Sequence, residues 1–150
     1  MKRMQIKVIC LALVLALCGA GMALAADEGT AINNSYTLIS HGKYAQAQKL
    51  LDQVLAKDPG NPVALNNLAA AMVGMKKFDK ADTYLNQALP KAQGYMVAVN
   101  RVCTVGNICV ALMPVSGEKG DQDLGPLVKM NMEMVKGMME AAPIPGKGLR

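Results

Sequence analysis

The chain has 150 residues, which is enough for one modest domain. Its formal net charge of +5 comes without a basic stripe interleaved with aromatic residues, so nucleic-acid binding is not supported. With a single histidine, His41, no phosphate-binding loop and no cluster of metal-ligating side chains, the sequence offers no centre for acid–base or nucleophilic chemistry. We therefore expect no enzyme, no cofactor and no bound metal.

The N-terminal segment 1–25 has the features of a secretory signal peptide. Three basic residues lie within the first seven, residues 8–17 form an unbroken apolar run, and Ala-Leu-Ala at 23–25 supplies the small residues of a cleavage site. Cleavage after Ala25 leaves 13 of the 16 basic residues against 11 acidic ones, a net charge of +2. We predict a periplasmic or secreted chain with no stable membrane anchor.

Two other interpretations of this segment, a membrane anchor and a lipid-attachment site, have less support from the sequence. A membrane anchor needs about 20 apolar residues, whereas this run is shorter and is followed by Gly19 and Gly21. A lipid attached to Cys18 needs a small residue just before the cysteine, and Leu17 stands there. Export with cleavage therefore remains the main expectation.

Equivalent positions lie 34 residues apart in two segments, namely GKYAQAQKLLDQVLAKDPGNP at 42–62 and MKKFDKADTYLNQALPKAQGY at 75–95. Their aromatic, alanine and leucine positions coincide, and these positions are expected to form the repeat core. The coinciding pairs are Tyr44 with Phe78, Ala47 with Ala81, Leu51 with Leu85, and Leu55 with Leu89. They recur at helical spacing, so they predict amphipathic helices that pack through this row.

Four helices are expected, at about 30–41, 44–57, 62–75 and 78–89. Between the second and the third, Pro59 and Gly60 end a helix, Asn61 can cap the next, and Pro62 suits a first helical turn. Consecutive helices are expected to pair antiparallel.

Residues 28–93 resemble the tetratricopeptide repeat family. Its signature combines a Gly-x-Tyr/Phe-x-x-Ala turn, an Ala-Leu-like pair before a proline, and an Asn-Pro that opens the next repeat. The residues that carry it are Gly42, Tyr44, Ala47, Leu55, Pro59, Asn61 and Pro62, then Phe78, Ala81, Ala88 and Leu89. The pattern is broken at Ala31 and Ser35, where the family favours a large aromatic residue and a glycine, at Lys76 in place of a turn glycine, and at the early Pro90.

The resemblance implies a short curved solenoid whose first helices line a concave groove for a partner protein or peptide. The partner-binding residues it implies are Ile32, Asn33, Tyr36, Ile39, Asn66, Asn67, Ala70 and Val73. Some family members grip a carboxylate with basic residues at such places. Here Ile32 and Val63 occupy the cationic positions, so the groove is expected to take an extended or helical segment with apolar anchors. Local backbone bonding by Asn66 and Asn67 remains an alternative to partner contact.

Two repeats leave an apolar end exposed, because each repeat buries its face against a neighbour. Residues 94–142 are expected to cover that end, and a second copy of the chain is the alternative. Within them, residues 95–113 alternate as a strand does and contain the turn signal Gly106-Asn107. We predict a β-hairpin there, with a degenerate third-repeat helix as the main rival.

The spacing of Cys103 and Cys109 provides a test of the hairpin prediction. Residues six apart on a helix point about 120° apart, so a single helix could not bridge them. In a hairpin they face each other across a three-residue loop of Val105, Gly106 and Asn107, whereas a two-residue Gly106-Asn107 turn would put them on opposite faces. Export favours a disulfide, and with it the longer loop. Buried free thiols remain open, and a redox-active pair is disfavoured because the usual redox spacing is Cys-x-x-Cys.

A final helix is expected at about 123–141, capped by Asp121 or Asp123, before a mobile tail at 143–150. It carries five methionines, namely Met130, Met132, Met134, Met138 and Met139. Clustered thioethers select copper(I), so a soft-metal protein is the alternative function, although methionine more often fills cores and contacts partners. The sequence thus predicts a mainly α fold, with two repeats, a hairpin and a methionine-rich helix, that serves as an exported adaptor.

Overall fold

The computed structural model describes residues 27–114 and 118–141. The predicted signal peptide at 1–25 and the predicted tail at 143–150 lie outside these residues. Four helices come first, namely α2 (Glu28–Ser40), α3 (Tyr44–Lys57), α4 (Pro62–Gly74) and α5 (Phe78–Ala92). They pack in sequence as two helix pairs, as the repeat predicted.

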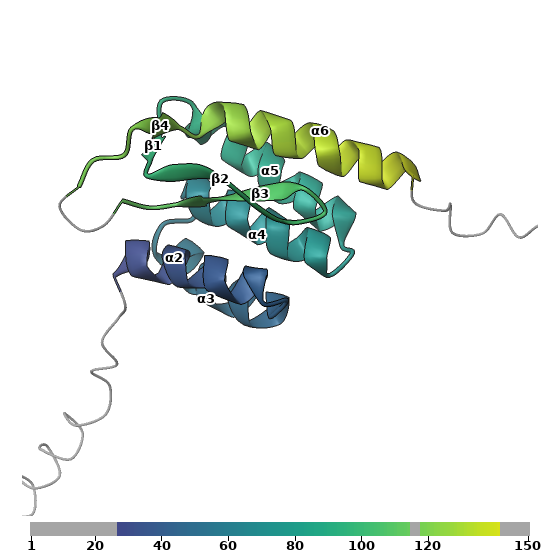
Figure 1. Cartoon of the computed structure of the whole chain (residues 1–150), viewed down its shortest axis with the longest axis horizontal. Coiled ribbons are helices and arrows are strands. Elements are labelled where there is room, and N and C mark those ends of the chain that lie inside the picture. The colour runs from purple at the N-terminus through teal and green to yellow at the C-terminus, as the bar shows by residue number, and fades with distance from the viewer. Residues whose placement is uncertain (1–26, 115–117, 142–150) are drawn as a thin grey trace, which may run out of the picture.

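The second half adds four strands and one helix. The elements are β1 (Met96–Val97), β2 (Val99–Val105), β3 (Ile108–Leu112), β4 (Gln122–Asp123) and α6 (Gly125–Ala141). β2 and β3 form an antiparallel hairpin, and β1 pairs with β4 at its base. Figure 1 shows the hairpin lying in front of α4, with α2 on one side and α6 on the other. The predicted mainly helical fold is confirmed, and the rival helix at 95–113 is excluded.

The two repeats bury equivalent residues in equivalent ways. Ala47 and Leu51 in α3 are fully buried, and so are Ala81 and Leu85 in α5. Tyr44, Phe78, Leu55 and Leu89 are partly buried and pack against the same core. Helix α5 continues past the predicted end at 89, because the buried Ala92 extends its apolar row beyond Pro90.

Helix α4 forms the centre of the molecule. Every residue from Pro62 to Val73 is buried, because helices lie on two sides of it and the hairpin covers a third. The row Ala69-Ala70-Ala71 lets these neighbours approach closely. The side chain of Asn61 caps the helix by accepting hydrogen bonds from the amides of Val63 and Ala64 at 3.1 and 2.9 Å.

The turns within the two repeats share one backbone conformation but differ in residue type. Gly42 has φ +71°, and Lys76, 34 positions later, has φ +59°. Glycine adopts this left-handed region freely, whereas a side chain is strained there. The lysine that replaces the family's glycine at position 76 therefore adds backbone strain to this turn.

The hairpin corrects one prediction. Cys103 lies opposite Cys109 and the two form a disulfide, as expected. The turn, however, has two residues, since Val105 pairs with Ile108. Gly106 and Asn107 have φ +51° and +63°, as a tight type I′ turn requires. The predicted three-residue loop is wrong because a β-bulge at Thr104 absorbs the odd residue and brings the cysteines face to face.

Candidate functional site

The groove predicted for a partner contains the chain's own strand β3. Of its eight predicted residues, Asn33 and Tyr36 are half-buried and the other six are buried. The buried six are Ile32, Ile39, Asn66, Asn67, Ala70 and Val73. The expectation of an open groove is wrong for this conformation, because β3 packs against α2, α4 and α6. Partner binding by these eight residues stays a prediction.

Three asparagines hold β3 through its backbone, each in the same way. The amide oxygen accepts a bond from a strand N–H, and the amide nitrogen donates to the C=O of the same strand residue. Asn33 binds Met113 at 2.8 and 3.1 Å. Asn67 binds Ala111 at 2.9 and 2.8 Å. Asn131 binds Cys109 at 3.0 and 2.7 Å. We call Asn33, Asn67 and Asn131 the asparagine row.

A fourth asparagine, Asn66, connects Asn67 with Asn131 through hydrogen bonds. Asn66 donates to the carbonyl of Cys109 at 3.1 Å and to Oδ1 of Asn67 at 3.2 Å, and it accepts from Asn131 at 2.8 Å. Asn66, Asn67 and Asn131 are all 0% exposed. Buried amides are tolerated when their donors and acceptors are paired, as they are here. Of the described residues that are buried, none carries a formal charge, so the site is electrically neutral.

The asparagine row occupies one repeat position three times. Asn33 lies five residues after Glu28, Asn67 five after Pro62, and Asn131 five after Pro126. Helix α6 packs against α5, as the first helix of a third repeat would. Helix α6 thus takes the place that the first helix of a third repeat would have, and the inserted segment that contains the hairpin folds back over the repeats.

Sequence reasoning missed Asn131. It treated residues 123–141 as a capping helix and examined methionines there instead. The signal was present, because Pro126 and Asn131 reproduce the spacing of Pro62 and Asn67. The comparison at a single fixed period could not detect it, since the insertion changes the distance between the second and third repeats.

Strand β3 uses its two edges differently. In an antiparallel strand, the N–H and C=O of successive residues point to opposite edges. Cys109, Ala111 and Met113 face the asparagine row, while Val110 and Leu112 face β2, where the carbonyl of Leu112 accepts from the amide of Ala98 at 3.0 Å. The groove therefore holds one edge of a two-stranded sheet.

The disulfide fastens the strand that occupies the groove. Cys109 is 0% exposed and its backbone is held by Asn131 and Asn66, whereas Cys103 lies on the solvent side of the hairpin and is exposed. The bond therefore fixes β2 to β3 at the residue that the asparagines bind.

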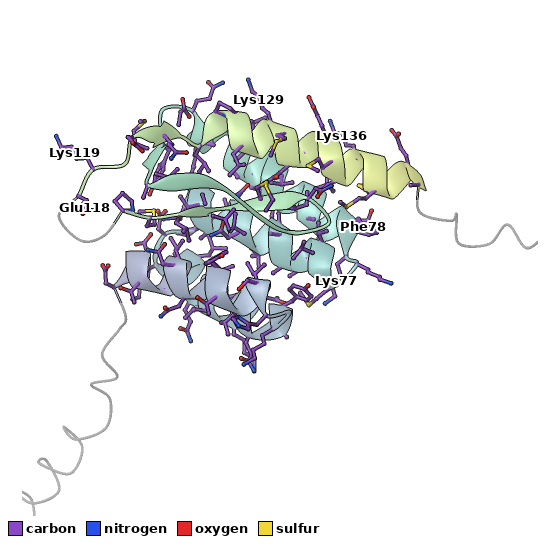
Figure 2. All side chains as sticks on the ribbon, in the orientation of Figure 1. Lys77, Phe78, Glu118, Lys119, Lys129 and Lys136 are labelled. Atoms are coloured by element: carbon purple, nitrogen blue, oxygen red, sulfur yellow. A yellow bond between two sulfur atoms is a disulfide. The ribbon has the colours of Figure 1, made fainter. Side chains whose placement is uncertain are left out.

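Helix α6 ends the array with a charged outer face. Lys129, Glu133, Lys136 and Glu140 are exposed, and Figure 2 shows Lys129 and Lys136 pointing away from the other helices. Met130, Met132, Met134 and Met138 instead pack against the core, while Met139 is exposed. Among the described residues, this charged face of α6 therefore forms one outer surface of the helical array.

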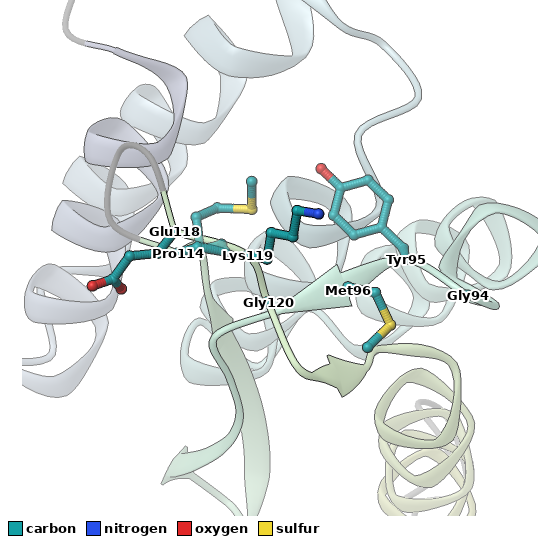
Figure 3. Close-up of a pocket in the computed structure, with 8 residues that line it drawn as sticks. Gly94, Tyr95, Met96, Pro114, Glu118, Lys119 and Gly120 are labelled. Atoms are coloured by element: carbon teal, nitrogen blue, oxygen red, sulfur yellow. The ribbon is translucent and has the colours of Figure 1, made fainter.

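A pocket of about 450 Å³ opens where the strand leaves Asn33. It is lined by Gly94, Tyr95, Met96, Met113, Pro114, Glu118, Lys119 and Gly120. Figure 3 shows Lys119 extending toward the ring of Tyr95 while Glu118 points away. Burial raises the pKa of the Tyr95 hydroxyl, the nearby carboxylates of Glu28 and Asp58 raise it further, and a hydrogen bond with Asn61 opposes them. The phenol is therefore neutral at ordinary pH.

Two absences hold for residues 27–114 and 118–141. No group of three or more His, Cys, Asp or Glu side chains there could hold a metal ion. No helix in the same part of the chain has the length and apolarity needed to cross a membrane. The single histidine lies at the end of α2, where Nδ1 of His41 is 2.7 Å from the carbonyl of Thr37.

The helix pairs, their regular period and the concave asparagine row together describe a helical repeat. Residues 38–101 match the family model described as tetratricopeptide repeat. This stretch is a tetratricopeptide repeat domain. The match spans α3, α4, α5 and β1, together with the end of α2 and the start of β2. No curated protein matches the chain, and no solved structure matches it.

Proposed function

We propose that this protein is an exported, non-enzymatic scaffold that holds an extended segment of another protein in its tetratricopeptide groove, which β3 occupies when no partner is bound. Such domains typically bind other proteins. One observation carries the proposal, namely that each asparagine of the row binds both the N–H and the C=O of one strand residue. A groove built in this way recognises extended backbone.

Backbone recognition makes the groove indifferent to much of a partner's sequence. Every residue except proline carries the same N–H and C=O pair, so any extended chain can supply the contacts that Cys109, Ala111 and Met113 supply now. Side chains then act through size and charge, which set what the neutral walls of the groove accept.

The resident strand sets the affinity that a partner needs. β3 is tethered to the groove, and a short tether gives an effective concentration on the order of millimolar. A partner segment must therefore bind more tightly than the resident strand, or the hairpin must first be released. This competition would keep the groove closed to weakly bound chains.

Export is part of the proposal and rests on the sequence of residues 1–25. The disulfide is consistent with it, because such bonds persist in oxidising compartments and are rare in the cytosol. The periplasm or the extracellular space would keep Cys103 and Cys109 joined and the hairpin closed.

The test is to empty the groove and offer it a peptide. In the full-length Ala111→Asp variant, a buried and unpaired carboxylate should expel β3, because no buried residue among those whose side chains the structure describes is a cation that could pair with it. A labelled peptide with the sequence of residues 107–114, NICVALMP, should then bind, as measured by fluorescence anisotropy. Binding to the unmodified chain should be at least about 10-fold weaker because β3 competes.

Two controls make the result interpretable. Met96→Asp places the same charge on the exposed β1, so β3 should stay in place and the peptide should not bind. Adding Asn67→Leu to Ala111→Asp removes the central backbone contact and should abolish binding. An Ala111→Asp chain with native helical circular dichroism that fails to bind the peptide would contradict the proposed function.

A further inference from the structure

We infer that the groove selects the uncharged edge strand of an antiparallel β-sheet, rather than an isolated peptide, as its partner segment. This inference rests on the proposed function and names the class of partner. It comes from the way in which the chain's own sheet meets the asparagine row.

The first step concerns the two edges of the bound strand. The bonds from the row to the strand backbone go to Cys109 and Ala111, on one edge of β3, and to Met113, which directly follows β3 on the same edge. The opposite edge carries β2 along its length. The occupant seen in the structure is thus a strand already paired on its far side, and the asparagines take the place of the next strand of a sheet.

The second step concerns what an edge strand needs. Unpaired N–H and C=O groups along a sheet edge are a site of aggregation unless they are covered. Three bidentate amides at alternate residues cover such an edge without adding a strand that would itself have a free edge. The groove therefore suits a sheet edge that must be kept from pairing with other chains.

The third step concerns the side chains. Ile108, Cys109, Val110 and Ala111 are all 0% exposed, so both faces of the bound strand are covered. A charged side chain at any of these four places would be buried without a partner, which proteins avoid. The partner edge is therefore uncharged over the stretch that corresponds to 108–111.

The fourth step concerns size. Ala111 binds Asn67 in the middle of the row. One helical turn further along α4 lies Ala70, also 0% exposed. Small residues on both sides allow the strand to come close enough for the amide to reach both backbone atoms. The partner therefore carries alanine, glycine or serine at this central place.

The experiment compares four ligands on the full-length Ala111→Asp chain. They are the linear peptide of residues 107–114, the same peptide N-methylated at the position of Ala111 or of Val110, and a disulfide-closed hairpin peptide of residues 98–113. The hairpin should bind at least about 10-fold more tightly than the linear strand, because it is already ordered and its far edge is paired. Methylation at Ala111 should weaken binding about 10-fold, while methylation at Val110 should leave it within about twofold.

The outcomes separate the two proposals. If no ligand binds, the proposed function fails. If the linear peptide binds as well as or better than the hairpin, the function stands and the edge-strand inference is overturned. Equal losses from the two methylations would also overturn it, because the row would then not distinguish the edges of the strand.

A second measurement covers the case in which Ala111→Asp does not fold. The native full-length chain, isotope-labelled, is titrated with the unlabelled hairpin peptide to millimolar concentration, and the backbone amide resonances of Cys109 and Ala111 in the chain's own β3, which leave the asparagines when β3 is displaced, are followed by NMR. Exchange of β3 for the added hairpin should shift these resonances, and the linear peptide should shift them less at equal concentration. A larger shift with the linear peptide would overturn the inference.

Discussion

The helical repeats and the hairpin are held in the molecule by different kinds of contact. The repeats bury side chain against side chain, through rows such as Leu51 and Leu85. The hairpin also buries apolar side chains such as Ile108, but in addition its strand is held at three backbone positions by amide side chains from α2, α4 and α6. Truncating an apolar core side chain costs transfer and cavity free energy, whereas removing a buried amide leaves backbone groups without hydrogen-bond partners. The two regions should therefore respond differently to substitution.

The largest effect is expected in the repeats. Leu51 and Leu85 occupy equivalent positions of the two repeats, and both are 0% exposed. Replacing either by alanine removes buried methylene groups and leaves a cavity, so each variant should lose about 3 kcal/mol of unfolding free energy. Urea denaturation followed by circular dichroism measures both. Losses that differ by more than about 2 kcal/mol would show that the repeats do not pack equivalently.

The second-largest loss of stability is expected when a contact that holds the hairpin is removed. Asn67→Leu keeps the size of the side chain but leaves the N–H and C=O of Ala111 buried without partners, which should lower the unfolding free energy by about 2–3 kcal/mol. Asn34→Leu is the matched control, because Asn34 is exposed on α2 beside Asn33, and it should change stability by no more than about 0.5 kcal/mol. A similar response to both changes would remove the distinction between the two regions.

The disulfide should contribute less than the amides that it supports. Closing a loop over a sequence separation of six residues restricts the unfolded chain by about 2 kcal/mol. The double variant Cys103→Ser and Cys109→Ser should lose about that much stability and keep its helical content. Thermal unfolding with and without a reductant provides the check, since a reductant should destabilise the native chain and leave the variant unchanged.

The smallest effect is a gain in stability. Lys76 has the left-handed conformation that Gly42 has in the first repeat. Lys76→Gly should relieve this strain and stabilise the chain by about 0.5–1 kcal/mol, as thermal unfolding would measure. The reverse change, Gly42→Lys, should cost about 1 kcal/mol. If both changes destabilise the chain, then Lys76 makes a contact that outweighs its backbone strain.

The repeats could be predicted because their information is local and periodic. Tyr44 and Phe78, or Ala47 and Ala81, indicate equivalent helices through spacing alone. Asn61 and Pro62 mark the start of α4 by ordinary capping chemistry. The ends of helices are predicted less exactly than their centres. Helix α5, for example, continues past Pro90 because Ala92 is buried.

The groove's occupant could not be predicted in the same way. The bonds from Asn33 to Met113 and from Asn67 to Ala111 join residues 80 and 44 positions apart, and no periodic pattern links an asparagine to a strand backbone. No sequence signal marks the bulge at Thr104 either. Its position depends on the strand register that satisfies both the disulfide and the two-residue turn.

The central claim is that the asparagine row holds β3 in the groove. Backbone hydrogen exchange at Ala111 tests it most directly, because its N–H is 2.9 Å from Oδ1 of Asn67. The amides of Cys109 and Ala111 should exchange as slowly as those of the α4 core, such as Met72, and Ala111 should lose this protection in Asn67→Leu. Exchange at Ala111 as fast as at the exposed Lys119, while α4 stays protected, would contradict the account.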